Sequence, residues 1–453
     1  MKLCRIKIYK CLVLIFMVLF CLIITMPVLA EPKIGFREAV KDAFENNNEF
    51  RAFRDNLAAI KKDIGIERSK LLPNLNFEEA FASTNNPAGA LTYKLEQSRI
   101  TPADLAIAEL NHPKPVSNFL TGIYLEQPVF DRKLNINLSI AKTEFSSQTF
   151  EYLRKWDELV NKVALAYSDV DKNLKLVSAA QKDVEETQEN LDAIQLKLNN
   201  KKDIYSSVLR ATTALVDIKQ LLVSAKADLK IFKRALGLVL GKCETVDIIE
   251  DAFKDLPFKE ECYYNNASLG RNDIKSLELK YENAKNDIKL AAADYLPKIG
   301  IAGSYEFYSA NAPFGGHGNN YLASAFVRWE MFDGLRRRNE KSKAQDKAME
   351  ACENLEGFKK DVSYQVFAAY SVVEAKKENW RLAEEALKTA KEARDHMLIR
   401  YKKSNALVVD LLLTQTNLNM ARINSIIQEN NYINALINIS FASGTILKDL
   451  NIV

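Results

Sequence analysis

The sequence is poor in the side chains that enzymes and metal centres use. Its 453 residues include only three histidines, His112, His317 and His396, which are scattered along the chain. No group of histidines and cysteines has the spacing of a metal site. No nucleophile–base pair or phosphate-binding loop stands out either, so the sequence predicts neither an enzyme nor a bound cofactor.

Cysteine is also scarce. Three of the six cysteines lie within the first thirty residues, and Cys243, Cys262 and Cys352 lie beyond them. An odd number of cysteines does not make a disulfide framework. Cys243 and Cys262 flank one short segment and would be able to pair in an oxidising compartment. The sequence leaves that pairing open.

An excess of charge of one sign is missing as well. Residues 1–30 carry four of the 63 Lys and Arg and none of the 59 Asp and Glu, so 59 charges of each sign remain after them. A nucleic-acid-binding protein needs a basic face. We therefore expect no nucleic-acid partner.

Only one long apolar run occurs, and it lies at the N-terminus. A basic start is followed by an uncharged stretch over residues 11–25 and by the small residues of Pro27-Val28-Leu29-Ala30. This is the pattern of a secretory signal peptide, which we assign to residues 1–30. A retained membrane anchor is the alternative, but the apolar run is short for a membrane-spanning helix.

What the chain does contain is a duplication. Leu72-Pro73 recurs as Leu296-Pro297, 224 residues later, and each pair separates a helical pattern from a strand-like one. A second strand-like run then ends at residues 128–131 or 330–333, and a helical stretch of about seventy residues follows. We expect a first repeat over residues 31–241, a linker at mid-height over 242–264, and a second repeat over 265–453.

The helical stretches have the spacing of coiled coils. Apolar seam residues alternate at steps of three and four, a mean period near 3.5. Gln181, Gln188 and Gln195 fill missing positions of the first seam, and Lys376 and Arg394 interrupt the second. We predict long helices over 131–199 and 333–402 and shorter ones over 35–71, 205–240, 269–296 and 407–443. The simplest packing stacks two short helices end to end beside each long one.

Four segments alternate as β-strands do. They cover residues 74–83, 119–129, 298–308 and 321–331, and about ten residues is the length that crosses a bilayer as a tilted strand. Four strands cannot close a barrel alone, and open edges are not tolerated in lipid. Closure therefore requires several chains, and three copies would give twelve strands. Two soluble hairpins are the alternative. The loop over 84–118 has no predicted fold.

The order and duplication of these patterns resemble the TolC-like outer-membrane efflux protein family. The matching features include Phe36-Arg37-Glu38-Ala39-Val40, the Leu-Pro pairs and Phe332-Asp333-Gly334. The resemblance implies a homotrimer in the outer membrane of a Gram-negative bacterium, with a 12-stranded barrel in lipid and a coiled-coil helical barrel in the periplasm. It also implies a periplasmic adaptor protein and an inner-membrane pump of the RND or ABC type as partners.

The resemblance further implies roles for four residues at the far ends of the helical hairpins. Lys201 and Ser404 occupy the tip turns at which members of the family dock an adaptor. Tyr401 matches an aromatic that locks neighbouring helices, and Asp410 matches an acidic position that narrows the aperture. Alternatively, Asp410 only stabilises the positive end of its helix dipole.

The function that these features predict is a passive duct of a tripartite export system, with efflux of small toxic compounds or metals favoured. A duct dedicated to type I protein secretion is one alternative. A soluble coiled-coil protein of the cell envelope is another, although it leaves the strands unexplained.

Overall fold

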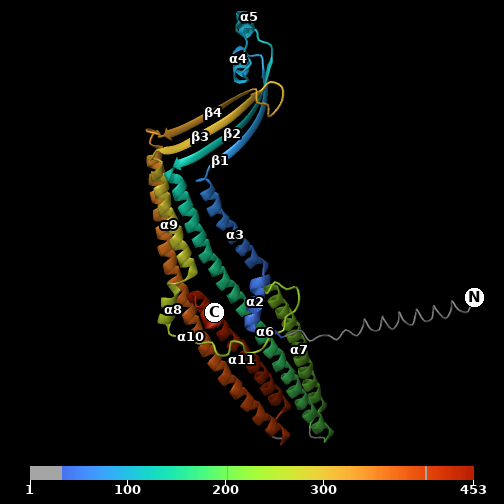
Figure 1. The fold of residues 1–453 in the computed structure, drawn as a ribbon. Coiled ribbons are helices and arrows are strands. Elements are labelled where there is room, and N and C mark those ends of the chain that lie inside the picture. Colours follow the sequence, from blue (N-terminus) through green and yellow to red (C-terminus); the bar gives the residue numbers. More distant parts are fainter. Residues whose placement is uncertain (1–32, 201–202, 404–405, 453) are drawn as a thin grey trace, which may run out of the picture.

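The computed structural model describes residues 33–200, 203–403 and 406–452. The predicted signal peptide lies outside these residues. A curved antiparallel sheet occupies one end of the molecule, and long helices extend from it toward the opposite end (Figure 1). Helices account for most of the chain, so the prediction of a mainly helical protein with two strand pairs is confirmed.

The sheet contains four strands in the order β1-β2-β3-β4. They are β1 (Asn74–Thr84), β2 (Val116–Phe130), β3 (Lys298–Ser309) and β4 (Gly318–Arg328). All four predicted strands are confirmed, but the predicted end of the fourth at residue 331 is wrong. Lys298 pairs with Arg328 as the last ladder position, so residues 329–331 have no strand to pair with. β1 and β4 each have one neighbour and leave one edge open.

The two faces of the sheet differ in polarity. Side chains alternate between faces along a strand, and residues paired across an antiparallel ladder share a face. The face that includes Phe77, Ile123, Tyr305 and Tyr321 is apolar and exposed. The opposite face is largely polar and includes Glu78, Tyr124, Ser304, Glu306 and Asn320.

The helices form a curved layer below the sheet. The long helices are α6 (Arg132–Asn199) and α10 (Arg336–Lys402). The shorter helices beside them are α3 (Asn48–Ser69), α7 (Tyr205–Val239), α9 (Asn272–Ala293) and α11 (Val408–Ser443). On one side of α6 lie α3 and then α7, and on its other side lie α9 and then α11, which also contact α10. The predicted end-to-end stacking of short helices is confirmed.

The upper seam of α6 forms the main hydrophobic core. Val160, Val163, Tyr167 and Val170 are fully buried, as the period of 3.5 predicts. Lower down, the predicted seam residue Leu191 is buried, but the predicted seam positions Gln181 and Gln195 are wrong, because both are exposed. The buried positions of that part include Asp183, Thr187 and Asn190 instead. Asp183 and Asn190 have polar partners on α11, and Thr187 donates to the carbonyl of Asp183 in its own helix. A pattern of apolar residues does not reveal such partners.

The first predicted helix, over 35–71, is broken into α2 (Phe36–Asn46) and α3. Asn47 causes the break. Its side chain accepts a hydrogen bond from the backbone N–H of Phe50 at 3.0 Å and donates one to the carbonyl of Val239 at 2.8 Å. Asn is a favoured N-cap. The cap therefore starts a new helix and ties it to the end of α7.

The segment between the two halves wraps around the molecule at mid-height. Ile34 and Ile248 form a parallel bridge, and the hydroxyl of buried Tyr167 donates to the carbonyl of Ile249 at 2.7 Å. α8 (Glu261–Ser268) begins inside the predicted linker, over 242–264, and extends four residues beyond its end, and α9 begins at Asn272 rather than at residue 269. Cys243 and Cys262 are free thiols.

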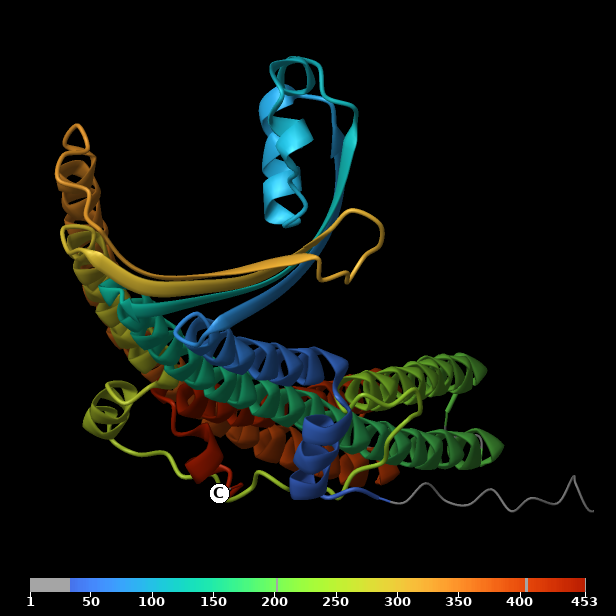
Figure 2. The ribbon, with the colours of Figure 1, turned by 45° about the horizontal axis from the view of Figure 1, so that its top comes forward.

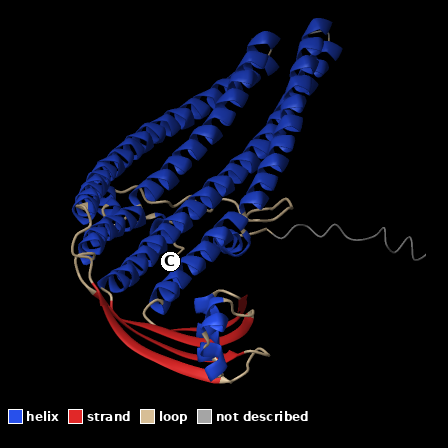
Figure 3. Cartoon of the chain, turned by 90° about the horizontal axis from the view of Figure 1, so that it is seen from above, coloured by secondary structure: helices blue, strands red, loops and turns tan. Residues whose placement is uncertain are grey.

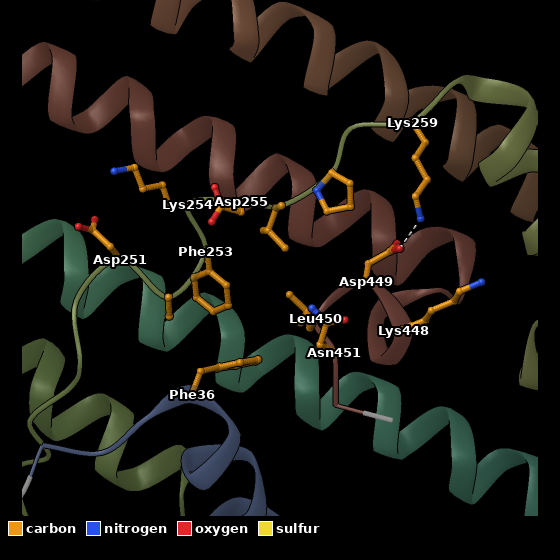
Figure 4. A pocket seen from close by; sticks show the side chains of 13 residues that line it. Phe36, Asp251, Phe253, Lys254, Asp255, Lys259, Lys448, Asp449, Leu450 and Asn451 are labelled. Atoms are coloured by element: carbon orange, nitrogen blue, oxygen red, sulfur yellow. Dashed lines mark hydrogen bonds and ion pairs between the residues drawn. The ribbon is translucent and has the colours of Figure 1, made fainter.

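A hollow lies between this segment and the C-terminal residues that follow α12 (Ile446–Asp449) (Figure 4). Phe36 and Phe253 stack edge to face within it, with ring centroids 4.8 Å apart. Lys259 pairs with Asp449 at 2.8 Å. The pair of Lys259 and Asp449 therefore holds the C-terminal part of the chain against the mid-height segment.

The loop over 84–118 is a folded helical insertion. It contains α4 (Pro87–Glu96), the short 3-10 helix η1 (Pro102–Leu105) and α5 (Ile107–Asn111). In the described parts of the chain, no helix combines the length and the apolar character needed to cross a bilayer.

Candidate functional site

The candidate site lies at the end of the molecule farthest from the sheet. The hairpins α6–α7 and α10–α11 both end there (Figures 1 and 3). One apolar cluster joins all four helices, and its buried members are Leu191, Ile194, Ala211, Leu215, Tyr401, Val408 and Leu411. The two hairpins therefore share a core at their tips.

Tyr401 connects the hairpins directly. It is 1% exposed, and its hydroxyl donates to the carboxylate of Asp203 at 2.7 Å. The ammonium of Lys197 lies 3.8 Å from the centre of the Tyr401 ring. Asp203 also accepts from the hydroxyl of Ser207 at 2.7 Å and from the backbone N–H of Ile204. We call the bond between Tyr401 and Asp203 the tip bond.

The protonation states of the pair suit this bond. Burial and the nearby Asp203 carboxylate raise the pKa of Tyr401, so its hydroxyl keeps the proton that it donates. Burial alone would raise the pKa of Asp203. Hydrogen bonds from Ser207 and Tyr401 outweigh burial, so the pKa of Asp203 lies below 3.8. The carboxylate is therefore ionised at neutral pH.

A second connection lies further along α6. Arg422 of α11 pairs with Asp183 and, at 3.0 Å, with Glu186. Arg394 of α10 reaches the same Glu186 at 3.1 Å. Gln415 donates to Glu186 at 3.1 Å. We call Asp183, Glu186, Arg394, Gln415 and Arg422 the buried polar network.

This network explains why Arg394 interrupts the apolar seam of α10. Its side chain is 10% exposed and points into the helical layer, where it pairs with the carboxylate of Glu186. The sequence offered one signal, a charged residue at a seam position. It gave no indication that Asp183 and Glu186, over two hundred residues earlier, would supply the opposite charges.

Two of the four predicted tip residues, Tyr401 and Asp410, lie within the described residues. Asp410 lies in the first turn of α11 and is half-buried. Among the described residues, its carboxylate has no hydrogen-bond or ion-pair partner. Both predicted roles, in an aperture or at a helix dipole, fit this position. Lys201 and Ser404 lie outside the described residues.

The described ranges contain no cluster of His, Cys, Asp and Glu that would hold a metal ion. The charged groups at the tip instead pair across helices. These pairs hold the two hairpins together.

Known structures share this architecture. A membrane protein from Pseudomonas aeruginosa superposes with a TM-score of 0.76 and 18% identity, over 90% of this chain and 92% of that one. The open state of the outer membrane channel MtrE from Neisseria gonorrhoeae gives 0.74 and 16%, over 91% and 89%. The outer membrane protein VceC from Vibrio cholerae gives 0.73 and 13%, over 90% and 96%. A comparison with curated protein sequences finds no match.

The fold is therefore that of the outer-membrane channels. Residues 39–242 and 263–445 match the family described as outer membrane efflux protein, and the chain belongs to that family. It is therefore an efflux protein of the outer membrane. The predicted family, location and general function are confirmed.

The buried polar network predicts a large effect of Arg422→Met. The change leaves the Asp183 side chain, 2% exposed, without its cation. We expect the free energy of unfolding to fall by roughly 3–5 kcal/mol, the usual cost of stranding a buried charge. Denaturant titration of the purified protein, followed by circular dichroism, measures this.

The matched control is Arg381→Met. Arg381 pairs with Glu378 at 2.8 Å, but both side chains are more than half exposed. Exposed pairs contribute about 0–1 kcal/mol, so this variant should unfold almost as the parent does. Equal losses in the two variants would contradict a special role for the network.

Proposed function

We propose that three copies of the chain close into a 12-stranded barrel in the outer membrane, which a helical tunnel continues into the periplasm. The open edges of β1 and β4 support this, because a sheet in lipid must satisfy every backbone group. The apolar, exposed face of the sheet suits contact with outer-membrane lipid, and the polar face suits a water-filled interior.

The helical layer supports the same closure. Apolar side chains are exposed on α7 at one edge of the layer, including Val216, Leu221, Val223 and Ile231. Others are exposed on α10 at the opposite edge, including Met349, Tyr364 and Phe367. Two different complementary edges form a head-to-tail interface, which closes into a ring when the rotation fits.

The activity that we propose is passive conduction. A periplasmic adaptor and an inner-membrane pump, of the RND or ABC type, deliver substrates, which leave through the interior of the trimer. Small toxic compounds or metals are the substrates that we favour. The tips that contain Lys201 and Ser404 are our candidates for adaptor docking, and the tip bond is our candidate for holding the entrance narrow.

We also propose that the chain consists of two repeats, over 31–241 and 265–453, joined by residues 242–264. The order helix, strand, strand, long helix, shorter helix occurs in both halves. The family match likewise falls into two stretches, 39–242 and 263–445.

The assembly is tested by purifying the protein from membranes. We expect extraction only with detergent and a single trimeric species in analytical ultracentrifugation. A water-soluble monomer of the processed chain would refute the closed duct.

The tip bond gives a test of conduction. Tyr401→Phe keeps the ring in the shared core but removes the hydroxyl that donates a hydrogen bond to Asp203. We expect a higher conductance of the trimer in planar bilayers, because the hairpins are then joined less tightly. Acidification through the lowered pKa of Asp203 should have the same effect in the parent, because protonation removes the ionised acceptor.

The control for this change is Tyr364→Phe, on the same helix but 70% exposed. It should conduct like the parent. If Tyr401→Phe also conducts like the parent, the tip bond does not limit the entrance.

Asp410 is tested by ion selectivity. If copies of this carboxylate line the entrance, Asp410→Ala should reduce the preference for cations and weaken block by divalent ions. If Asp410 serves only its helix dipole, selectivity stays unchanged and stability falls by about 0.3–1 kcal/mol. Asp217→Ala, an exposed acid further along α7, removes the same charge away from the tip and should leave selectivity unchanged.

A further inference from the structure

The helical insertion between β1 and β2 lies against the polar face of the sheet. Gln97, at the end of α4, donates to the side chain of Asn118 and to the carbonyl of Ser117, both at 2.8 Å. Asn118 in turn donates to Glu96 at 3.3 Å. Asn118 shares its face of β2 with Tyr124, so the insertion covers the polar face and not the apolar one.

The insertion also approaches β4 closely. A side chain at Gly318, the first residue of β4, would overlap the carbonyl of Glu96. The glycine therefore permits contact between the end of α4 and the far strand of the sheet. In Figure 2, α4 and α5 lie on the concave side of the sheet, at the end opposite the one that continues into the long helices.

The insertion is a folded unit rather than an open loop. Asn86 caps α4 through the backbone N–H of Gly89, at 3.1 Å. Lys94 pairs with Asp104 at 2.5 Å, and Asp104 also accepts from the hydroxyl of Thr101 at 2.8 Å. Gln97 is 1% exposed. The bonds of Asn86, Lys94 and Asp104 hold the insertion together, and the bonds of Gln97 attach it to β2.

Its apolar side chains are left without cover. Leu105 is 56% exposed, and Ile107 is 78% exposed. They belong to a segment held on the polar face, which is the inner face of the closed barrel proposed above. If the barrel closes as proposed, the insertions of all three copies lie on its inner face, where they can cover one another's apolar side chains.

We propose that the α4–α5 insertions of the three copies meet inside the outer mouth of the barrel through Leu105 and Ile107 and form an outer gate. This inference rests on the proposed trimeric duct. It gives the channel a second narrow point, in series with the tip. Apolar side chains that meet across a narrow pore oppose conduction by excluding water.

The contact is tested by cross-linking in the full-length protein. Cys243, Cys262 and Cys352 are first replaced by serine, and Ile107→Cys is then introduced. Under air and copper phenanthroline, which oxidises two neighbouring thiols to a disulfide, we expect subunit dimers that dithiothreitol cleaves. Leu105→Cys is a second variant with the same expectation.

The matched control is Asn311→Cys, in the exposed connection between β3 and β4. This position lies outside the insertion and should give no dimers under the same oxidant.

Conductance tests the gate itself. β1 and β2 stay paired up to Thr84 and Val116, so replacing residues 85–115 with an Asn-Gly turn keeps the hairpin closed. The tip and the mouth lie in series along the duct, so a narrow tip would mask the effect of a wider mouth. The replacement is therefore made in the Tyr401→Phe background. We expect a higher conductance than with Tyr401→Phe alone.

The outcomes separate this inference from the duct. A trimer that conducts, but shows neither dimers at Ile107 and Leu105 nor a gain on replacing the insertion, refutes the gate and leaves the duct standing. Dimers without a gain in conductance also refute the gate, because the insertions then meet without limiting flow. A parent protein that forms no trimer refutes the duct itself.

Discussion

The structure depends on one constraint, which is that a single copy cannot satisfy its own edges. β1 and β4 end the sheet, and each leaves one edge without a partner strand. The helical layer ends in apolar side chains on α7 and α10. Backbone groups in lipid and apolar surface in water are both costly to leave uncovered. In the trimer that we propose, neighbouring copies remove both costs at once, because barrel and tunnel close together.

Within one copy, the hairpins meet through an apolar core at their tips and through buried polar contacts beside it. Arg394 and Arg422 share Glu186, and Tyr401 reaches Asp203. Contacts of this kind require a defined geometry, whereas apolar packing tolerates small shifts. The tip is therefore a region in which a small number of bonds distinguishes a narrow arrangement from a wider one.

The helical insertion, at the other end of the molecule, also combines polar contacts with apolar side chains that are left uncovered. Its polar anchors, Gln97 and Asn118, hold it on the polar face of the sheet, and Leu105 and Ile107 remain exposed. In the duct that we propose, the two ends would use different chemistry, with hydrogen bonds and ion pairs at the tip and apolar contact at the mouth.

The sequence by itself determined the elements and their order. Periods of two and 3.5, the repeated Leu-Pro pairs and the two lengths of helix predicted the strands, the long helices and their stacking, because these follow from local alternation and from burial of one face. The family followed from the same order. Only the tertiary structure decided the break at Asn47, the polar replacement of the seam at Asp183 and Asn190, the partners of Arg394 and Tyr401, and the face that the insertion covers. Each of these depends on groups far apart in the chain, and a local pattern carries no information about which distant partner will satisfy a buried polar group.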